Sequence, residues 1–317
     1  MTSILITGGA GFIGSHLAKR LISENFQVSI IDNLSTGSLT NLEGIIDSVR
    51  FVQGDILDIN LLEELIVKND VIFHMAAAVG VKNIIENPIG SLETNYTGSE
   101  NLLTLSSKHN KRVFIASTSE IYGKNPNQPL REDFDRLVGA PQKLRWTYAD
   151  AKALEESLAY ALFLRDGLKV TTLRFFNTVG PNQTGMYGMV IPRFVKSAKS
   201  NQPLEIYGDG SQTRVFCHVQ DVVDALIILQ SKDETIGQVY NIGGIGEISI
   251  LELANKILEL TNSKSKIIYR DYSDVYPPTF EDMLRRVPDI SKIKNAINWS
   301  PSRDLNQIIN DVSLSFS

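Results

Sequence analysis

Short runs of apolar, β-branched residues alternate with longer segments of helical periodicity through the first half of the chain. The helical segments repeat their apolar positions every three or four residues, as one buried helix face requires. The predicted strands are Ser3–Thr7, Val28–Ile31, Arg50–Val52, Val71–Met75, Arg112–Ala116 and Val170–Arg174, and the predicted helices include Ser15–Ser23, Asn60–Lys68, Gly98–His109 and Trp146–Arg165. Such alternation predicts an α/β fold with a Rossmann-type doubly wound parallel sheet.

The pattern changes after Arg174, where glycine and proline become frequent over residues 180–210. A strand-like run at Val239–Ile242 and a helical segment at Ser249–Leu260 follow. We predict a first domain of residues 1–174 plus about 215–242. The remainder, about 175–214 plus 243–317, is predicted to form a smaller, interleaved C-terminal α/β lobe.

Composition narrows the class of protein. The chain has 317 residues, 43% of them hydrophobic, and a formal net charge of −5, which disfavours nucleic acid as a partner. The single cysteine, Cys217, excludes internal disulfides, and the four histidines show no metal-ligand spacing, so no metal site is predicted. Neither an 18-residue apolar run nor a signal-peptide pattern is present, and we expect a cytoplasmic protein that does not enter a membrane.

A glycine-rich turn joins the first predicted strand to the first predicted helix. Gly9, Gly11 and Gly14 satisfy the pattern G-x-G-x-x-G in the strand–turn–helix context that this pattern requires. These glycines permit a tight turn, close approach of the backbone to a pyrophosphate and close packing of helix on strand, while the helix N-terminus attracts phosphate. We therefore predict a dinucleotide site that includes Gly8, Gly11, Phe12, Ile13 and Gly14.

Asp32 ends the second predicted strand, where a carboxylate can accept hydrogen bonds from the adenosine ribose. The same negative charge would repel a 2′-phosphate, so the predicted cofactor is NAD rather than NADP. The other cofactor candidates stand at the ends of strands or beside Asp32. They are Asn33, Asp55 (a candidate contact of the adenine amino group), Ile56, and the small residues Ala76 and Ala77.

Tyr148 and Lys152 stand four residues apart and so share one face of a predicted helix. Because a nearby ammonium favours the phenolate, we expect Lys152 to lower the pKa of Tyr148. Tyr148 would then take a proton from a sugar hydroxyl while hydride leaves for NAD. The preceding strand ends in the polar run Thr118, Ser119 and Glu120, and such groups are costly at the end of a buried strand unless they are paired or used.

These motifs together resemble the extended short-chain dehydrogenase/reductase superfamily of nucleotide-sugar epimerases, dehydratases and decarboxylases over nearly the whole chain. The similar segments are Thr7–Gly14, the Tyr148/Lys152 pair, Arg174–Pro181 and Tyr207–Arg214. The resemblance implies that Thr118 shares the substrate hydroxyl with Tyr148 and that Lys152 also binds the nicotinamide ribose. It implies that the smaller lobe binds a UDP-sugar or another NDP-sugar, through Asn177, Val190, Arg193, Tyr207, Arg214 and Arg286.

The same resemblance implies a homodimer assembled through a four-helix bundle. The helices concerned are those predicted at Gly98–His109 and Trp146–Arg165. We expect both to present apolar outer positions.

The superfamily divides on the fate of a transient 4-keto sugar. Ser119-Glu120, Arg145–Tyr148 and Phe280–Ile290 are similar to segments of UDP-glucuronate decarboxylases, and the last segment is the one that brings their catalytic arginine, here Arg286. In that reaction CO2 leaves a β-keto acid and a cation stabilises the resulting enolate. We therefore favour UDP-glucuronate decarboxylation, forming UDP-xylose or a UDP-4-keto-pentose.

Three alternatives stay open. Typical xylose synthases carry an arginine at about Met189, and its absence keeps a UDP-sugar 4-epimerase acting on UDP-glucose, UDP-glucuronate or UDP-GlcNAc as the main alternative. A 4,6-dehydratase usually has an aspartate where this chain has Ser119. A non-catalytic NAD-binding protein would keep the same fold, although the complete Thr118, Tyr148 and Lys152 set argues for an enzyme.

Overall fold

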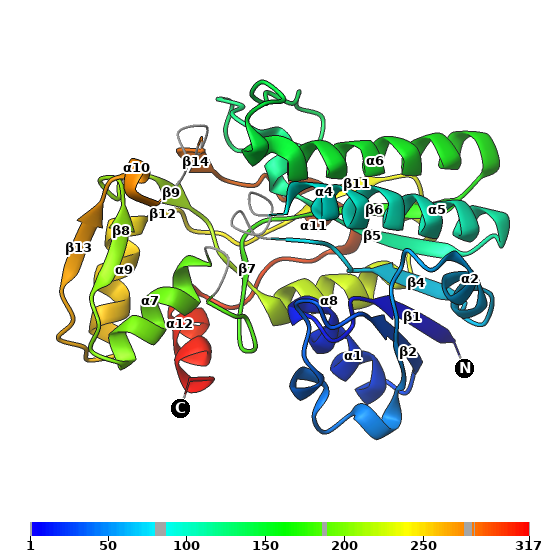
Figure 1. The fold of residues 1–317 in the computed structure, drawn as a ribbon, viewed down its shortest axis with the longest axis horizontal. Coiled ribbons are helices and arrows are strands. Elements are labelled where there is room, and N and C mark those ends of the chain that lie inside the picture. The colour runs from blue at the N-terminus through cyan, green and yellow to red at the C-terminus, as the bar shows by residue number, and fades with distance from the viewer. Residues whose placement is uncertain (1, 80–86, 186–188, 276–280, 282, 317) are drawn as a thin grey trace.

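The computed structural model describes residues 2–79, 87–185, 189–275, 281 and 283–316. Seven strands, all parallel, form one sheet in the order β3-β2-β1-β4-β5-β6-β11 (Figure 1). This arrangement confirms the predicted Rossmann-type doubly wound sheet. The strands are β1 (Ser3–Thr7), β2 (Gln27–Asp32), β3 (Arg50–Gln53), β4 (Val71–His74), β5 (Arg112–Thr118), β6 (Lys169–Phe175) and β11 (Val239–Ile242).

Two apolar layers cover the two faces of the sheet. The helices α1 (Phe12–Ser23), α8 (Val219–Gln230) and α11 (Ser291–Ile297) share one buried cluster, and α2 (Ile59–Val67), α5 (Gly98–Lys108) and α6 (Thr147–Asp166) share the other. Successive side chains along a central strand point to opposite faces of the sheet and so contribute to both layers. Ile4 and Ile6 of β1 belong to the first cluster, and Leu5 between them belongs to the second.

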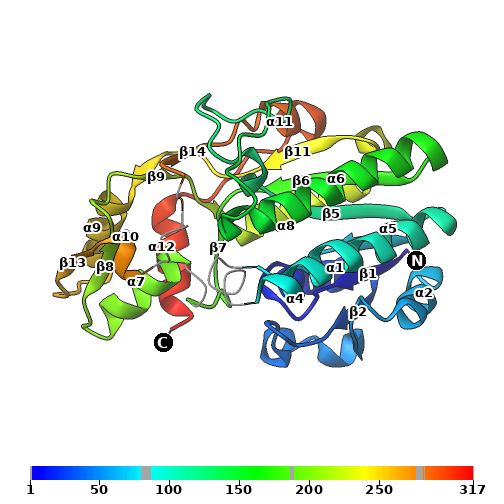
Figure 2. The same ribbon diagram turned by 45° about the horizontal axis from the view of Figure 1, so that its top comes forward.

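The smaller lobe stands at one end of the sheet, remote from the N-terminus (Figures 1 and 2). Its core is a separate apolar cluster to which α7, α9, α12 and the strand β8 contribute. The lobe consists of α7 (Val190–Lys199), α9 (Ile250–Leu260), α10 (Tyr272–Val275), α12 (Leu305–Leu314), β8 (Leu204–Tyr207) paired with β13 (Ile267–Arg270), and β9 (Thr213–Arg214) between β12 (Ile248–Ser249) and β14 (Arg285–Arg286).

Short elements connect these parts. β7 (Thr178–Val179) pairs with β10 (Cys217–His218), and α4 (Pro88–Leu92) runs through a π-helical turn (Glu93–Thr97) into α5. The 3₁₀ turns are Leu39–Leu42, Ile46–Ser48, Ser119–Tyr122, Leu144–Trp146 and Asp233–Thr235.

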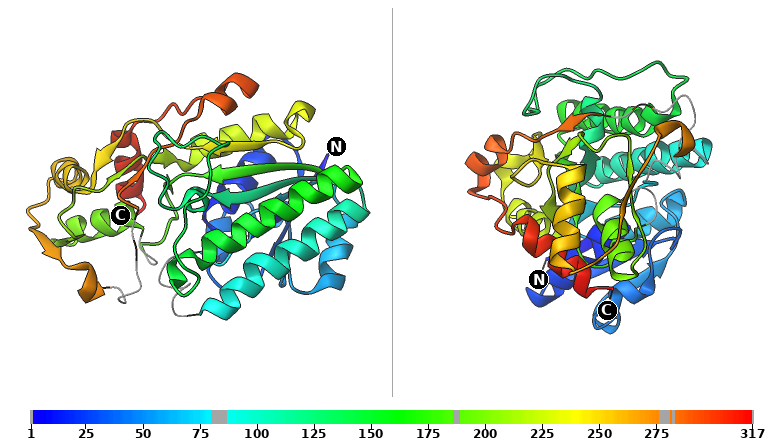
Figure 3. Two further views of the ribbon diagram at one scale, coloured as in Figure 1. Left: turned by 90° about the horizontal axis from the view of Figure 1, so that it is seen from above. Right: turned by 90° about the vertical axis from the view of Figure 1, so that its left-hand side faces the viewer.

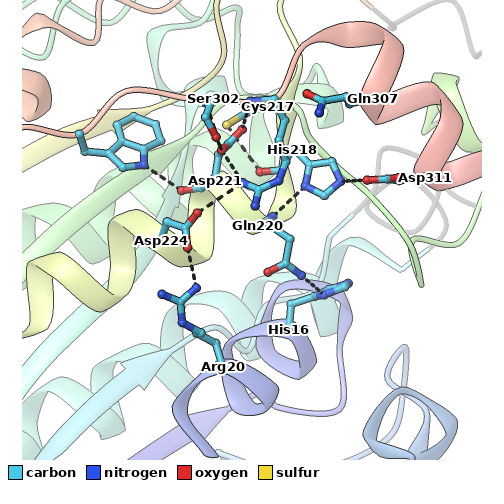
Figure 4. Close-up of polar contacts among 12 residues, drawn as sticks. His16, Arg20, Cys217, His218, Gln220, Asp221, Asp224, Ser302, Gln307 and Asp311 are labelled. Atoms are coloured by element: carbon cyan, nitrogen blue, oxygen red, sulfur yellow. Dashed lines mark hydrogen bonds and ion pairs between the residues drawn. The ribbon is translucent and has the colours of Figure 1, made fainter. Parts of the chain in front are cut away.

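The chain passes between the two parts more often than the sequence indicated. The segment 291–299, which was predicted in the smaller lobe, packs on the sheet through Ile293, Ile297 and Trp299. Next to it, Asp221 of α8 is buried beside Ser302 (Figure 4). It accepts hydrogen bonds from the backbone N–H groups of Ser302 and Arg303, and from the Arg303 guanidinium at 2.6 Å. This network fastens the C-terminal segment to the sheet.

The outer surfaces of α5 and α6, which lie side by side in Figure 3, differ in polarity. On α6, Leu154, Tyr160 and Leu164 are 50%, 53% and 66% exposed, as predicted. On α5, the exposed positions include Glu100 and Thr104, so the prediction of an apolar outer face was wrong for that helix. The leucines of α5 lie on its buried side, which faces the sheet.

No helix in the described ranges is long and apolar enough to cross a membrane. The same part of the chain contains no group of three or more His, Cys, Asp or Glu side chains placed to hold a metal ion.

Candidate active site

A cavity of about 640 Å³ lies between the carboxyl ends of the sheet strands and the smaller lobe. Ligands of open parallel sheets bind at this edge, where the strand order reverses between β1 and β4. Apart from Lys152, every site residue named from the sequence lines the cavity: Gly8, Gly11, Phe12, Ile13, Gly14, Asp32, Asn33, Asp55, Ile56, Ala76, Ala77, Thr118, Ser119, Glu120, Tyr148, Asn177, Val190, Arg193, Tyr207, Arg214 and Arg286.

The glycine turn forms a cradle that larger residues would fill. Gly8 has a φ of +69°, and a Cβ on Gly14 would stand 2.3 Å from the carbonyl oxygen of Gly8. Gly11 is the N-cap of α1 and has no side chain to cover the helix N-terminus. The backbone therefore stays accessible at the positive end of the helix, as a bound pyrophosphate requires.

Asp32 joins the end of β2 to this turn. Its carboxylate accepts hydrogen bonds from the backbone N–H of Ala10 at 2.9 Å and of Leu34 at 2.8 Å. Burial raises its pKa, and the backbone hydrogen bonds act against that rise. Beside it, Asn33 donates to Asp55 at 2.8 Å. Both residues were predicted to contact the cofactor, and this hydrogen bond holds them together.

The loop after β4 is fixed by a residue that the sequence did not single out. Buried Asn95, in the π-helical turn, accepts from the Ala78 N–H at 2.8 Å and donates to the Ala78 carbonyl at 2.9 Å. This two-point contact positions the wall formed by Ala76 and Ala77. π-helical turns often mark functional sites, but nothing in the local sequence signals this one.

The strand-end residues meet the tyrosine at the floor of the cavity. Thr118 caps the 3₁₀ turn that follows β5 by accepting the Glu120 N–H at 3.2 Å, and its side chain hydrogen-bonds to the Tyr148 hydroxyl. Ser119 is buried beside them. Thr118 and Tyr148 therefore lie together in the cavity wall, and their sharing of a substrate hydroxyl stays a prediction.

The predicted effect of Lys152 on Tyr148 is not present. Lys152 is fully buried, does not line the cavity, and donates to the Glu155 carboxylate at 2.7 Å. Burial raises the pKa of Tyr148, and the charges of Glu155 and Glu120 raise it further. The expectation of a lowered pKa was wrong because burial of the phenol has the largest effect, and the Lys152 ammonium is paired with Glu155.

Glu120 is held between two arginines. Its Oε1 lies 2.5 Å from Nη1 of Arg286, and its Oε2 pairs with Arg145, which is 5% exposed. Although burial alone would raise the pKa of Glu120, the two guanidiniums bring it to about 2. The three groups together carry a net positive charge in the cavity wall, and Glu120 is a carboxylate at every working pH.

The segment that brings Arg286 is anchored by Glu281. This carboxylate accepts from the Trp146 indole N–H at 3.0 Å, lies 3.1 Å from the Lys124 ammonium, and pairs with Lys143. These hydrogen bonds, against a smaller effect of burial, hold the pKa of Glu281 at about 2. Phe280 and Asp282 of the same motif lie outside the described residues.

Polar and aromatic side chains of the smaller lobe form the opposite wall. The Arg193 guanidinium lies 4.3 Å from the centre of the Tyr207 ring and donates to the Glu205 carbonyl at 3.0 Å. Strand pairing of β14 with β9 places Arg286 opposite Arg214. Arg286 also donates to Asn177 at 2.5 Å.

Sequence reasoning missed the roles of Arg145, Glu155 and Glu281. Arg145 was visible as part of a similar segment, and Glu155 follows Lys152 at a spacing that brings two helical side chains together. Glu281 had no such signal, because its partners Trp146 and Lys143 are more than 130 residues away in the chain.

The glycine cradle, the acid after β2 and the threonine–tyrosine pair beside a buried lysine define a Rossmann-type enzyme of the short-chain dehydrogenase/reductase class. A protein-family model described as GDP-mannose 4,6 dehydratase matches residues 5–312. The chain belongs to this family of extended short-chain dehydrogenases/reductases.

The relatives include several decarboxylases. UDP-N-acetyl-alpha-D-glucosaminuronate decarboxylase from Bacillus cytotoxicus is 45% identical over 300 residues, covering 94% of this chain and 92% of the relative. UDP-glucuronic acid decarboxylase 1 from Danio rerio is 36% identical over 314 residues, covering 99% of this chain and 72% of the relative.

Among solved structures, UDP-glucuronic acid 4-epimerase from Bacillus cereus, in complex with UDP-glucuronic acid and NAD, superposes with a TM-score of 0.89. It is 26% identical, and the match covers 99% of this chain and 98% of that one. The resemblance to nucleotide-sugar enzymes is thus confirmed in sequence and in fold.

Proposed function

We propose that this chain is an NAD-dependent decarboxylase of UDP-hexuronates that works through a transient 4-keto sugar. The observation that carries the proposal is Glu120 held between Arg145 and Arg286, in the wall that also contains Thr118 and Tyr148. The 45% and 36% identical relatives support it, because both are named as decarboxylases of UDP-uronates.

The residues present fit NAD. The backbone at Gly8, Gly11 and Gly14 would hold the pyrophosphate, and Asp32 the adenosine ribose, since a Cβ at Gly14 would fill the cradle. NAD, when bound, accepts a hydride from the sugar and later returns it. The negative charge of Asp32 at this position favours NAD over NADP.

The proton steps fall to the chain's own residues. Tyr148 Oη, as the phenolate, takes the proton from the C4 hydroxyl as the C4 hydride leaves, while Thr118, which hydrogen-bonds to Tyr148, orients that hydroxyl. The proton returns to O4 when the hydride returns to C4. Sugar and protein then have the same charge and redox state as before, except for the change at C5.

The net positive charge around Glu120 suits the change at C5. A uronate oxidised at C4 is a β-keto acid. The bond between C5 and the carboxyl carbon breaks, CO2 leaves, and the electron pair of that bond forms an enolate with the C4 carbonyl. Arg145 and Arg286 stabilise that negative charge, and C5 then takes up a proton. Typical xylose synthases carry an arginine at about the position of Met189, and Arg145 supplies a cation in its place.

The substituent at C2 distinguishes the two uronates named by the relatives, glucuronate and N-acetylglucosaminuronate. The 45% identity over nearly the whole length gives specific support to the acetamido sugar. Incubation of the purified protein with each UDP-uronate, with UDP-glucose and UDP-GlcNAc as controls, followed by mass spectrometry, tests the proposal. A UDP-pentose or UDP-acetamidopentose product is expected, and intact uronates at the end would overturn it.

A second candidate is 4-epimerisation, which the fold of the UDP-glucuronic acid 4-epimerase favours. An epimerase would release an isomer of unchanged mass, because the keto sugar turns over and takes hydride on its other face. A 4,6-dehydratase would release a product lighter by one water. The same mass spectra separate these outcomes from decarboxylation.

We also propose that the chain forms a homodimer through α5 and α6. The exposed Leu154, Tyr160 and Leu164 lie along α6 next to α5, and a second copy placed on this face would cover them. The polar outer positions of α5 would lie at the rim. Leu164→Glu is expected to convert a dimer into a monomer in light scattering, and a wild-type monomer would contradict the assembly.

A further inference from the structure

Lys152 and Glu155 form an ion pair that protein encloses on all sides. The ammonium donates to the carboxylate at 2.7 Å, and neither side chain is exposed to solvent. Their spacing of three residues places both on one face of α6. Because removing a charge from water costs several kcal/mol, each partner depends on the other for its compensation.

Uncharged groups surround the pair on the neighbouring elements. From α5, Ser99 is a neighbour of Glu155, and its hydroxyl donates to the Asn95 carbonyl at 2.7 Å. From β4, His74 Nε2 lies 2.9 Å from the same hydroxyl. Burial, with a smaller effect of the Lys152 charge, lowers the pKa of His74 to about 3, so this imidazole is neutral. Its other nitrogen lies 2.7 Å from the Thr7 hydroxyl.

The remaining titratable neighbours are Tyr148, Glu120 and Glu156, and Glu156 is paired with Arg174 at 2.8 Å. Tyr148 precedes Lys152 by about one helical turn, and burial, then Glu155, then Glu120 raise its pKa. The charge of Glu120 is balanced by two arginines. Glu155 is therefore the acid whose charge determines how strongly the Lys152 ammonium stabilises the Tyr148 phenolate.

We propose that Glu155 is a positioning residue that holds the Lys152 ammonium and balances its charge beside Tyr148, so that this carboxylate sets the pH range of proton transfer. The inference rests on the proposed function of Tyr148 as the proton acceptor. In this arrangement Glu155 orients Lys152, and neither residue lines the cavity. Tyr148 can accept the sugar proton only as the phenolate, so the pH at which its phenol ionises limits proton transfer.

The test compares wild-type protein with Glu155→Gln, which keeps the shape of the side chain and removes its charge. With the negative charge gone, Lys152 favours the phenolate, so the acidic limb of the kcat–pH profile is expected to move down by about one pH unit. The KM for the UDP-uronate should be unchanged. Asp150→Asn is the matched control, since Asp150 lies on the same helix but is exposed and pairs with Arg136, and its profile should follow the wild type.

A second readout needs no turnover. The Tyr148 phenolate is titrated by ultraviolet difference absorbance in the presence of NAD, using Tyr148→Phe proteins to subtract all other tyrosines. The Tyr148 midpoint is expected to be lower in Glu155→Gln than in wild type and unchanged in Asp150→Asn. Equal midpoints in wild type and Glu155→Gln would overturn the inference.

The two readouts separate the possible failures. Absence of uronate turnover in the wild type would reject the proposed function, while the phenol titration would still decide the role of Glu155. If Glu155→Gln does not fold, Glu155→Asp keeps the charge and shortens the side chain. It should retain the wild-type pH limb with lower kcat, and a displaced limb would overturn the inference.

Discussion

Glu120 Oε1 lies 2.5 Å from Arg286 Nη1, although the two residues are 166 positions apart in the chain. The first follows a central strand of the sheet, and the second belongs to a short strand of the smaller lobe. Their contact joins the two walls of the cavity. It also places a guanidinium beside the proposed proton-transfer residues Thr118 and Tyr148.

Glu120→Gln should reduce decarboxylation about 100-fold in kcat, because the variant keeps the side-chain shape but the Arg145 and Arg286 guanidiniums lose the carboxylate that holds them in position. NAD binding, measured by calorimetry, should not change. Glu247→Gln is the control. Glu247 pairs with the exposed Arg285, which precedes Arg286 on β14, and this variant should keep wild-type activity. Similar kcat values for the two variants would contradict this role of Glu120.

Asp32→Asn should weaken NAD binding about tenfold, equivalent to about 1.4 kcal/mol, and should narrow the preference for NAD over NADP. The amide keeps one acceptor oxygen, so it retains only one of the two hydrogen bonds that Oδ2 and Oδ1 accept from Ala10 and Leu34, and it loses the charge that repels a 2′-phosphate. Binding of both cofactors is measured by calorimetry for wild type and variant. An unchanged ratio of the two dissociation constants would show that Asp32 does not select the cofactor.

Buried His74 should make the fold sensitive to acid. Its pKa is about 3 in the fold against 6.5 ordinarily, so the unfolded chain binds the proton more tightly. The stabilising contribution is complete above pH 6.5 and is lost as the pH falls towards 3, by up to about 1.4 kcal/mol per pH unit. Urea unfolding between pH 7 and pH 4 should show a shallower decline for His74→Gln than for wild type.

Asp221→Asn should lower the free energy of unfolding by about 2–4 kcal/mol, because buried Asp221 accepts four hydrogen bonds from Ser302 and Arg303. Asp224→Asn is the matched control, since Asp224 is 30% exposed and its ion pairs with Arg20 and Arg303 should contribute less than about 1 kcal/mol. Equal losses in chemical denaturation would contradict the special role of Asp221.

The sequence predicts the sheet and the cavity lining well, because strand periodicity and the glycine turn are local signals. Charge effects were less predictable. The direction of the Tyr148 pKa depends on burial and on Glu155, which a Tyr–Lys spacing alone does not reveal. The anchoring of the Arg286 segment by Glu281 and the fixing of the Ala76 loop by Asn95 are likewise contacts between distant segments.

The release of CO2 tests the central claim most directly. UDP-glucuronate and UDP-N-acetylglucosaminuronate labelled at the carboxyl carbon are incubated with NAD and either wild-type protein or Tyr148→Phe, and the gas is trapped. The wild type should release labelled CO2 from at least one uronate. Tyr148→Phe should bind NAD normally and release at least 1000-fold less. Label retained in the sugar nucleotide with the wild type, or equal release by both proteins, would contradict the account.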